Sequence, residues 1–406
     1  MLRSLSRRAL STIRSAEVVT NSAAGKCIDL RISQDSNVRQ FVVPLVWFRD
    51  HCRGDSCYNH STNQRKSKLT DIFREAEILS SSSVKFDSPT QKMTITWKDG
   101  AQTTFTSDLI VELLVRQDRK PFTQVFRLWD QSTLQSPPTI NKSNFSFPDF
   151  SKKFADFGFV CVDGVEKTAE ATKKFASEIA PIHDTFYGDF WVFNNNAADQ
   201  EAYHEDTAYS SEEIGPHTDG TYFPQSPGIQ VFHCLRPADK GGETILVDGF
   251  SAAQKLKESD PEAYRILSTI PVDHHYIEKG DHSLFSWSPL RPIIELNAEG
   301  DIVQIRFNPY DRAPLRLSDK GFFSTPENIL SYYKAYQSFS RLCHDPSSSI
   351  KVSLQPGTVI FIDNLRVLHA RASFSGYRQM CGCYLSRDNL MAKARLHIEE
   401  EKRLQV

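Results

Sequence analysis

The chain has 406 residues, with 48 basic and 50 acidic side chains and a formal net charge of −2; 39 % of its residues are hydrophobic and 24 % are charged. This balance excludes a largely disordered chain, fits two domains or one large one, and gives no reason to expect nucleic acid as a partner. No apolar run approaches the roughly 20 residues that a membrane span needs, and 8 cysteines do not make a disulfide scaffold in a chain of this length.

The first residues have the composition of a targeting sequence. Residues 1–15 contain no acidic side chain, leucines recur among them at near-helical spacing, and they include Arg3, Arg7, Arg8 and Arg14. An amphipathic segment rich in Arg and Ser and free of acids is typical of a mitochondrial transit peptide. We therefore expect a protein of the mitochondrial matrix, with a frayed basic tail as the alternative.

Residues 16–120 show the pattern of a small β-rich domain. Val38–Trp47 has the composition of a strand, and Met93–Trp97 and Gln102–Thr106 flank an Asp-Gly turn typical of a hairpin. Ser, Thr, Asn and Pro accumulate in the following stretch, so we predict a linker over residues 121–145.

Residues 146–395 combine strands with long loops and few helices. Strands are expected at Gly228–Leu235, Thr244–Asp248, Ile302–Asn308, Thr358–Asp363 and Met380–Leu385. Helices are expected at Ala252–Leu256, Pro261–Leu267 and Pro326–Leu342. This pattern predicts a mainly β fold with flanking helices, built on a sandwich or barrel core.

A candidate metal site lies in this second region. In the extended segment His217-Thr218-Asp219, the first and third side chains point to the same face and can bind one ion. His369 follows about 150 residues later, and two histidines with one carboxylate are the ligand set of non-haem Fe(II) oxygenases. Arg378 comes shortly after and is suited to hold the carboxylate of a cosubstrate. A zinc hydrolase could use the same ligands, but no general base is evident on a neighbouring helix.

Five longer segments carry a resemblance to a known family: Val46–Tyr58, Pro216–Phe223, Gly228–Leu235, Gly241–Phe250 and Val359–Arg387. Through them the chain resembles the γ-butyrobetaine dioxygenase family of Fe(II)/2-oxoglutarate oxygenases, which act in carnitine biosynthesis. The resemblance implies a double-stranded β-helix (jelly-roll) catalytic domain, a smaller N-terminal β-rich domain and a homodimer. It also implies Fe(II) as cofactor, 2-oxoglutarate as cosubstrate and ascorbate as reductant.

The same resemblance implies a reaction on a small molecule. We expect O₂- and 2-oxoglutarate-dependent hydroxylation of N6,N6,N6-trimethyllysine at carbon 3, the first step of carnitine biosynthesis. Hydroxylation of γ-butyrobetaine, the last step, is the alternative; the family's enzyme for that step is usually cytosolic, so the presequence argues against it. A β-helix protein that binds a small molecule without catalysis is the alternative of another class, and the intact metal triad argues against that one.

Residue roles follow from the resemblance at matching positions. It places the iron ligands at His217, Asp219 and His369, and the 2-oxoglutarate contacts at Thr244 and Arg378. A trimethylammonium group donates no hydrogen bond, so aromatic faces hold it through cation–π attraction. The resemblance places this aromatic cage at Tyr187, Trp191, Tyr209 and Tyr384. Core packing is the alternative for each of them, and Gly220 stands where γ-butyrobetaine dioxygenase has a further cage tyrosine.

Two polar residues are expected at the other end of the substrate. Asp206 lies where γ-butyrobetaine dioxygenase has a neutral asparagine. A carboxylate there attracts the α-ammonium of trimethyllysine and repels a lone carboxylate. We expect Asp206 to contact the α-ammonium and Asn308 to reach the amino-acid end; a solvated loop is the alternative for Asp206.

The N-terminal domain departs from the family pattern. γ-Butyrobetaine dioxygenase has a zinc site there with three cysteines and a histidine. Here Cys52 and Cys57 remain, but Gly54 and Ala101 occupy the other two positions. Two ligands do not close a tetrahedral zinc site. A nearby histidine, His51 or His60, could substitute, but we favour buried reduced cysteines.

Overall fold

The structure is a computed structural model that describes residues 12–34, 37–66, 68–114, 127–196, 210–279 and 283–398. The chain divides into two compact units, Met1–Pro121 and Phe122–Val406. Among the described residues, no helix is both long and apolar enough to cross a bilayer.

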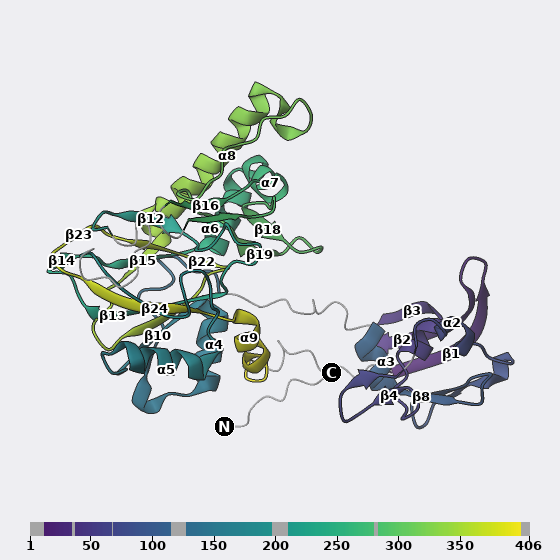
Figure 1. Ribbon diagram of the computed structural model, residues 1–406. Helices are drawn as coiled ribbons and strands as arrows, with labels where there is room; N and C mark the ends of the chain where they lie inside the picture. The colour runs from purple at the N-terminus through teal and green to yellow at the C-terminus, as the bar shows by residue number, and fades with distance from the viewer. Residues whose placement is uncertain are drawn as a thin grey trace. The chain divides into compact units, whose positions relative to one another are not determined.

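The N-terminal unit consists of antiparallel strands and short helices (Figure 1). One sheet has the order β1-β2-β3 and a second the order β6-β7-β8. The elements are β1 (Thr12–Asn21), β2 (Gly25–Gln34), β3 (Asn37–Pro44), α1 (Leu45–Asp50), β4 (Tyr58–Asn59), β5 (Gln64–Arg65), α2 (Ile72–Glu75), η1 (Ser81–Ser83), β6 (Val84–Asp87), β7 (Lys92–Thr96), β8 (Gln102–Thr106) and α3 (Ser107–Leu114). Both sheets and the helices α1 and α3 contribute side chains to one core, in which Phe48, Trp97 and Phe105 are buried.

The start of this unit differs from the expected transit-peptide boundary. β1 begins at Thr12, inside the range 1–15, while residues 1–11 lie outside the described residues. Ile13 is only 1 % exposed and lies opposite Ile32 of β2. Its backbone N–H also donates to the Gln91 side chain at 3.0 Å. The folded unit therefore begins before residue 16.

The strand expected over Val38–Trp47 is also shorter. β3 ends at Pro44, which is the N-cap of α1 with φ of −60° and ψ of 145°. The helix that follows buries Leu45 and Phe48 in the core, so the apolar run continues as one buried helix face rather than as a strand.

The C-terminal unit is built around two sheets (Figure 1). Side chains from both sheets belong to one buried core. The strand orders are β11-β24-β13-β21-β10-β9 and β12-β22-β15-β20. The first sheet contains β9 (Thr139–Asn141), β10 (Phe159–Asp163), β11 (Trp191–Asn194), β13 (Ile229–Arg236), β21 (Val359–Asp363) and β24 (Gln379–Leu385). The second contains β12 (Ile214–His217), β15 (Thr244–Asp248), β20 (Ser349–Val352) and β22 (Val367–Arg371). Ile360 of one sheet and Leu246 and Val367 of the other belong to the same buried cluster. The predicted mainly β, jelly-roll fold is confirmed.

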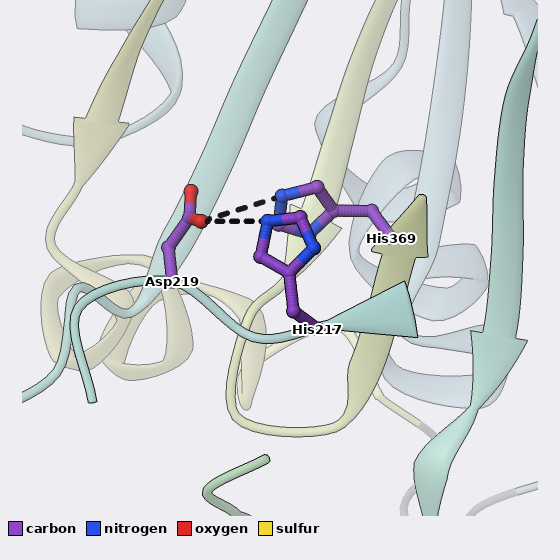
Figure 2. Close-up of side chains that lie close together, drawn as sticks. All are labelled: His217, Asp219 and His369. Carbon is purple, nitrogen blue, oxygen red and sulfur yellow. Dashed lines mark ion pairs between the residues drawn. The ribbon is translucent and has the colours of Figure 1, made fainter. Parts of the chain in front are cut away.

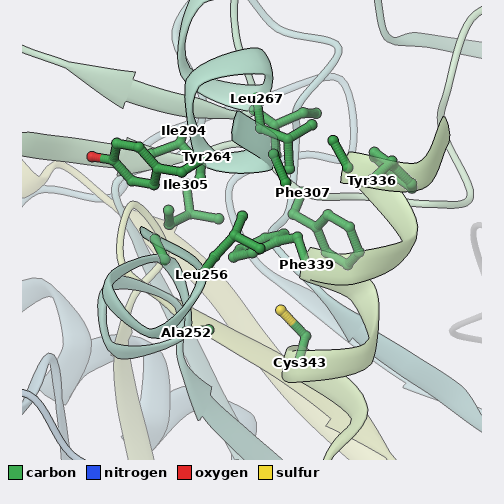
Figure 3. Close-up of a cluster of buried hydrophobic side chains, with 14 of the residues drawn as sticks. Ala252, Leu256, Tyr264, Leu267, Ile294, Ile305, Phe307, Tyr336, Phe339 and Cys343 are labelled. Atoms are coloured by element: carbon green, nitrogen blue, oxygen red, sulfur yellow. The ribbon is translucent and has the colours of Figure 1, made fainter. Parts of the chain in front are cut away.

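Helices cover the outer faces of this core. α4 (Phe147–Phe157) and α5 (Ala169–Ile179) pack on the six-stranded sheet. The four-stranded sheet is covered by three helices and a hairpin: α6 (Gly249–Ser259), α7 (Pro261–Thr269), α8 (Pro326–His344), and β18 (Ile294–Leu296) with β19 (Ile302–Ile305). Figure 3 draws apolar side chains from the core of this helical layer. Leu368 of β22 is buried in this helical layer. Because neighbours on a strand point to opposite faces, burying Leu368 turns His369 toward the interior of the jelly roll.

Shorter elements complete the unit: β14 (Lys240–Gly241), β16 (His275–Glu278), β17 (Leu284–Trp287), β23 (Phe374–Ser375), α9 (Arg387–Ala394), η3 (Lys142–Asn144), η6 (Phe322–Ser324) and η7 (Pro346–Ser348).

The expected linker over residues 121–145 belongs in part to this unit. From residue 127 the chain is packed on the jelly roll, and β9 pairs in parallel with β10. Trp129 is 2 % exposed, and its indole N–H donates to the Phe157 carbonyl at 2.7 Å. Trp129 and Ile140 anchor a segment that its polar composition otherwise marks as a linker. The remainder of the range, residues 121–126, lies outside the described residues.

Candidate active site

Three side chains on and just after two paired strands form a group that could hold a metal ion. His217 ends β12 and lies opposite His369 of β22, and Asp219 follows two residues later. The Asp219 Oδ1 atom lies 3.4 Å from Nε2 of His217 and 3.5 Å from Nε2 of His369 (Figure 2). No other group of three or more His, Cys, Asp or Glu side chains in the described part of the chain has this geometry.

Hydrogen bonds hold these ligands in place. His217 Nδ1 donates to the Gly215 carbonyl at 2.9 Å, which leaves Nε2 available to bind a metal ion. The buried Asn364 side chain accepts from the backbone N–H of Asp219 at 2.8 Å and donates to its carbonyl at 3.0 Å. The following residue, Gly220, has φ of +63°, and a Cβ there would lie 2.4 Å from Pro227 Cδ. This turn therefore has no room for the tyrosine that γ-butyrobetaine dioxygenase carries.

The electrostatics of the triad suit a divalent cation. Burial by itself raises the pKa of Asp219, but the nearby imidazoles of His369 and His217 outweigh it and hold this pKa well below the ordinary value. Burial lowers the pKa of His369, and Asp219 only partly offsets that effect. Asp219 outweighs burial at His217 and raises the pKa of that imidazole. Two imidazole nitrogens and one ionised carboxylate are the donor set that Fe(II) binds in oxygenases.

The triad opens into a pocket with a volume of about 330 Å³. Apart from the triad, the predicted site residues that line it are Tyr187, Trp191, Thr244, Asn308, Arg378 and Tyr384. The structure thus brings these residues together from distant parts of the sequence. Asp206 and Tyr209 lie outside the described residues, and their roles stay predictions.

A buried guanidinium is among the groups that line the pocket. Arg378 is 8 % exposed and Thr244, at the start of β15, is 7 % exposed. No carboxylate among the described residues pairs with Arg378, whose charged group lies 5.5 Å from the centre of the Phe374 ring. The Arg378 side chain also passes close to the backbone of Gly242, where a Cβ would lie only 3.3 Å from Arg378 Nε. Glycine at this position leaves room for the guanidinium. A buried cation without an acidic partner is suited to a ligand carboxylate.

Several other residues that line the pocket are aromatic. The ring centres of Trp191 and Tyr384 are 4.8 Å apart, and the hydroxyls of Tyr187 and Tyr222 share a hydrogen bond of 2.6 Å. Tyr276 lies 5.7 Å from Tyr187, centre to centre. The sequence prediction missed Tyr222 and Tyr276. Tyr222 is three residues from Asp219, a signal that could have found it, whereas nothing in the sequence links the β16 residue Tyr276 to the triad.

A carboxylate that the sequence prediction also missed lies beside Asn308. Asn308 Nδ2 donates to Asp311 Oδ2 at 2.6 Å, and Asn308 Oδ1 accepts from the backbone N–H of Tyr310 at 2.9 Å. Both Asn308 and Asp311 line the pocket. Asn308 therefore orients the Asp311 carboxylate, in addition to any contact that Asn308 itself makes with a ligand.

The cysteines of the N-terminal unit do not form a metal site with the residues described. Cys52 and Cys57 are buried, and the Thr103 hydroxyl donates to Cys52 Sγ at 3.1 Å. A ring nitrogen of His51 lies 2.8 Å from the Trp47 carbonyl, and one of His60 lies 2.9 Å from the Arg53 carbonyl. Each contact uses one ring nitrogen and leaves the other one for a further partner. Among the described residues, neither histidine joins Cys52 and Cys57 in a group of three or more ligands, and two cysteines alone do not close a tetrahedral zinc site.

A jelly roll that carries two histidines on paired strands, and a carboxylate just after one of these strands, has the architecture of a non-haem iron oxygenase. Residues 119–384 match the model of the taurine catabolism dioxygenase TauD, TfdA family. The chain belongs to this family, and the predicted class of Fe(II)/2-oxoglutarate dioxygenase is confirmed.

Curated relatives cover most of the chain. It is similar to the mitochondrial trimethyllysine dioxygenase of Mus musculus, with 36 % identity over 86 % of this chain and 82 % of that protein. The Homo sapiens protein of the same name is 35 % identical over 86 % of this chain and 82 % of its own length. A γ-butyrobetaine dioxygenase of Pongo abelii is 28 % identical over 87 % of this chain and 90 % of that protein.

Proposed function

We propose that this protein hydroxylates N6,N6,N6-trimethyllysine at carbon 3, with 2-oxoglutarate and O₂ as cosubstrates. The observation that carries the proposal is the content of one pocket: a metal triad, a buried guanidinium, a set of aromatic rings and a carboxylate. Its similarity to trimethyllysine dioxygenases over most of the chain supports the same substrate.

The triad and Arg378 serve the cosubstrate. His217, Asp219 and His369 would hold Fe(II), which supplies O₂ activation when 2-oxoglutarate is oxidised to succinate and CO₂. One oxygen atom enters succinate and the other enters the substrate. Arg378 and Thr244 bind the distal carboxylate of 2-oxoglutarate, because this guanidinium lacks an acidic partner among the described residues. Ascorbate would keep the iron reduced.

The aromatic rings serve the trimethylammonium group. Tyr187, Trp191 and Tyr384 line the pocket together with Tyr222 and Tyr276. A quaternary ammonium is attracted to such rings. Holding the cation at one end and the amino-acid group at the other positions a single carbon of the chain near the metal, which is the main contribution of the protein to the reaction.

Asp311 favours trimethyllysine over γ-butyrobetaine. Trimethyllysine carries an α-ammonium as well as a carboxylate, whereas γ-butyrobetaine carries only a carboxylate. A carboxylate at Asp311, oriented by Asn308, attracts the ammonium and repels a lone carboxylate. We propose the same contribution for Asp206.

The relatives also guide a proposal on where the protein acts. The mouse and human relatives are named as mitochondrial, and residues 1–11 contain three arginines and no acidic side chain. We propose that the protein acts in the mitochondrial matrix, as a homodimer.

The test is a turnover assay with each betaine separately. Purified protein with Fe(II), 2-oxoglutarate and ascorbate is expected to form succinate with trimethyllysine well above its rate without a betaine. Succinate formation with γ-butyrobetaine alone would overturn the proposal.

A further inference from the structure

The two carboxylate oxygens of Asp219 have different neighbours. Oδ1 faces Nε2 of His217 and of His369 at 3.4 and 3.5 Å, as the dashed lines in Figure 2 show. Oδ2 points elsewhere and accepts a hydrogen bond from the Tyr384 hydroxyl at 3.0 Å. One oxygen is therefore available to a metal, and the other is held by a tyrosine.

Tyr384 is well placed to hold it, because it lies within a central strand and not on a loop. In β24 it lies opposite Gln230 of β13, and its backbone carbonyl accepts from the N–H of His183 at 2.9 Å. The ring is 6 % exposed and packs on Trp191. Strand pairing and ring packing together fix the direction of the hydroxyl.

We infer that Tyr384 is a positioning residue that keeps Asp219 bound to the metal through one oxygen only. A carboxylate whose second oxygen is held by a hydroxyl does not readily rotate to chelate an ion with both oxygens. In a triad of two histidines and one carboxylate, single-oxygen binding leaves positions open for the cosubstrates. Tyr384 thus has a second function besides lining the pocket.

The inference rests on the iron site and not on the identity of the betaine. It is therefore tested with metal alone, in the absence of any organic substrate. Co(II) is the probe, because its visible absorption spectrum reports the number and arrangement of its ligands.

The test variant is Tyr384→Phe, which keeps the ring and removes the hydroxyl. Loss of such a partner is expected to weaken Co(II) binding about 10- to 100-fold and to change the visible spectrum of the bound ion.

The matched control is Tyr187→Phe, which removes another hydroxyl from the same pocket. That hydroxyl bonds Tyr222 and not Asp219, so Co(II) affinity and spectrum are expected to match the wild type. The rise in thermal midpoint on adding Co(II) gives a second reading of metal affinity for a variant with lower stability. Wild-type Co(II) affinity and spectrum in Tyr384→Phe, or an equal loss in both variants, would overturn the inference.

Discussion

At the scale of single residues, Arg378 shows how burial defines a ligand. Its guanidinium is 8 % exposed, and no acidic side chain among the described residues neutralises it. A buried charge without a partner is costly, so the site gains most from a ligand that brings the missing carboxylate. The binding of 2-oxoglutarate follows from this imbalance.

Replacing Arg378 should therefore act on the cosubstrate. Arg378→Gln is expected to raise the KM for 2-oxoglutarate by about 10- to 100-fold, since charge-assisted hydrogen bonds are lost. Arg378→Lys keeps the charge but not the bidentate geometry, so its KM for 2-oxoglutarate should lie between those of the wild type and Arg378→Gln. The exposed Arg236→Gln is the control. Steady-state succinate formation measures the effect, and an unchanged KM in Arg378→Gln would contradict the assignment.

Asp311 is the residue expected to discriminate between substrates. Asp311→Asn keeps the shape of the side chain and removes its charge. The preference for trimethyllysine over the analogue without the α-amino group should then fall by about tenfold. The ratio of the two kcat/KM values measures it, with Glu299→Gln, an exposed acid outside the pocket, as the control. If the ratio stays at the wild-type value, Asp311 does not contact the ammonium.

At the scale of elements, a buried histidine ties a helix and a loop to the central sheet. His233 of β13 donates from Nδ1 to the Thr172 hydroxyl of α5 at 2.7 Å and accepts at Nε2 from the N–H of Gly357 at 2.8 Å. This arrangement requires a neutral ring, because Nε2 acts as an acceptor. Burial lowers the pKa of His233 from 6.5 to about 4.

This histidine should make the fold sensitive to acid. The unfolded chain takes up the proton first as the pH falls, so stability is lost between pH 6.5 and about 4. Between pH 7.5 and 5.5, His233 lowers the free energy of unfolding by about 1.4 kcal/mol. Urea unfolding at both pH values measures this change. The free energy of unfolding of His233→Gln should fall less than that of the wild type, by about 1.4 kcal/mol. An identical drop in the two proteins would exclude this role for His233.

Strand positions were predictable from the sequence because buried strands have a simple pattern. Thr244–Asp248 is β15, and the strand predicted at Met380–Leu385 begins one residue earlier as β24. The triad was predictable too, since spacing by two residues in an extended segment puts two ligands on one face. Tyr276 and Asp311 were not, because they reach the pocket from later segments whose own sequence carries no metal-site pattern. The linker was predicted too long because a few anchoring apolar residues outweigh a polar composition.

At the scale of the whole molecule, the near-neutral charge agrees with a small zwitterionic substrate. Recognition of such a molecule depends on a few charges inside one pocket, and not on a field over the surface. All candidate cosubstrate and substrate contacts among the described residues lie in the C-terminal unit. The N-terminal unit has its own buried core and two buried thiols.

The most direct test of the central claim follows the oxygen atoms. Purified protein is incubated with Fe(II), 2-oxoglutarate, trimethyllysine and ¹⁸O₂, and the products are analysed by mass spectrometry and NMR. The proposed reaction predicts one ¹⁸O atom in succinate and one in a hydroxyl at carbon 3 of trimethyllysine. A hydroxyl at another carbon, or succinate formed while trimethyllysine stays unchanged, would contradict it.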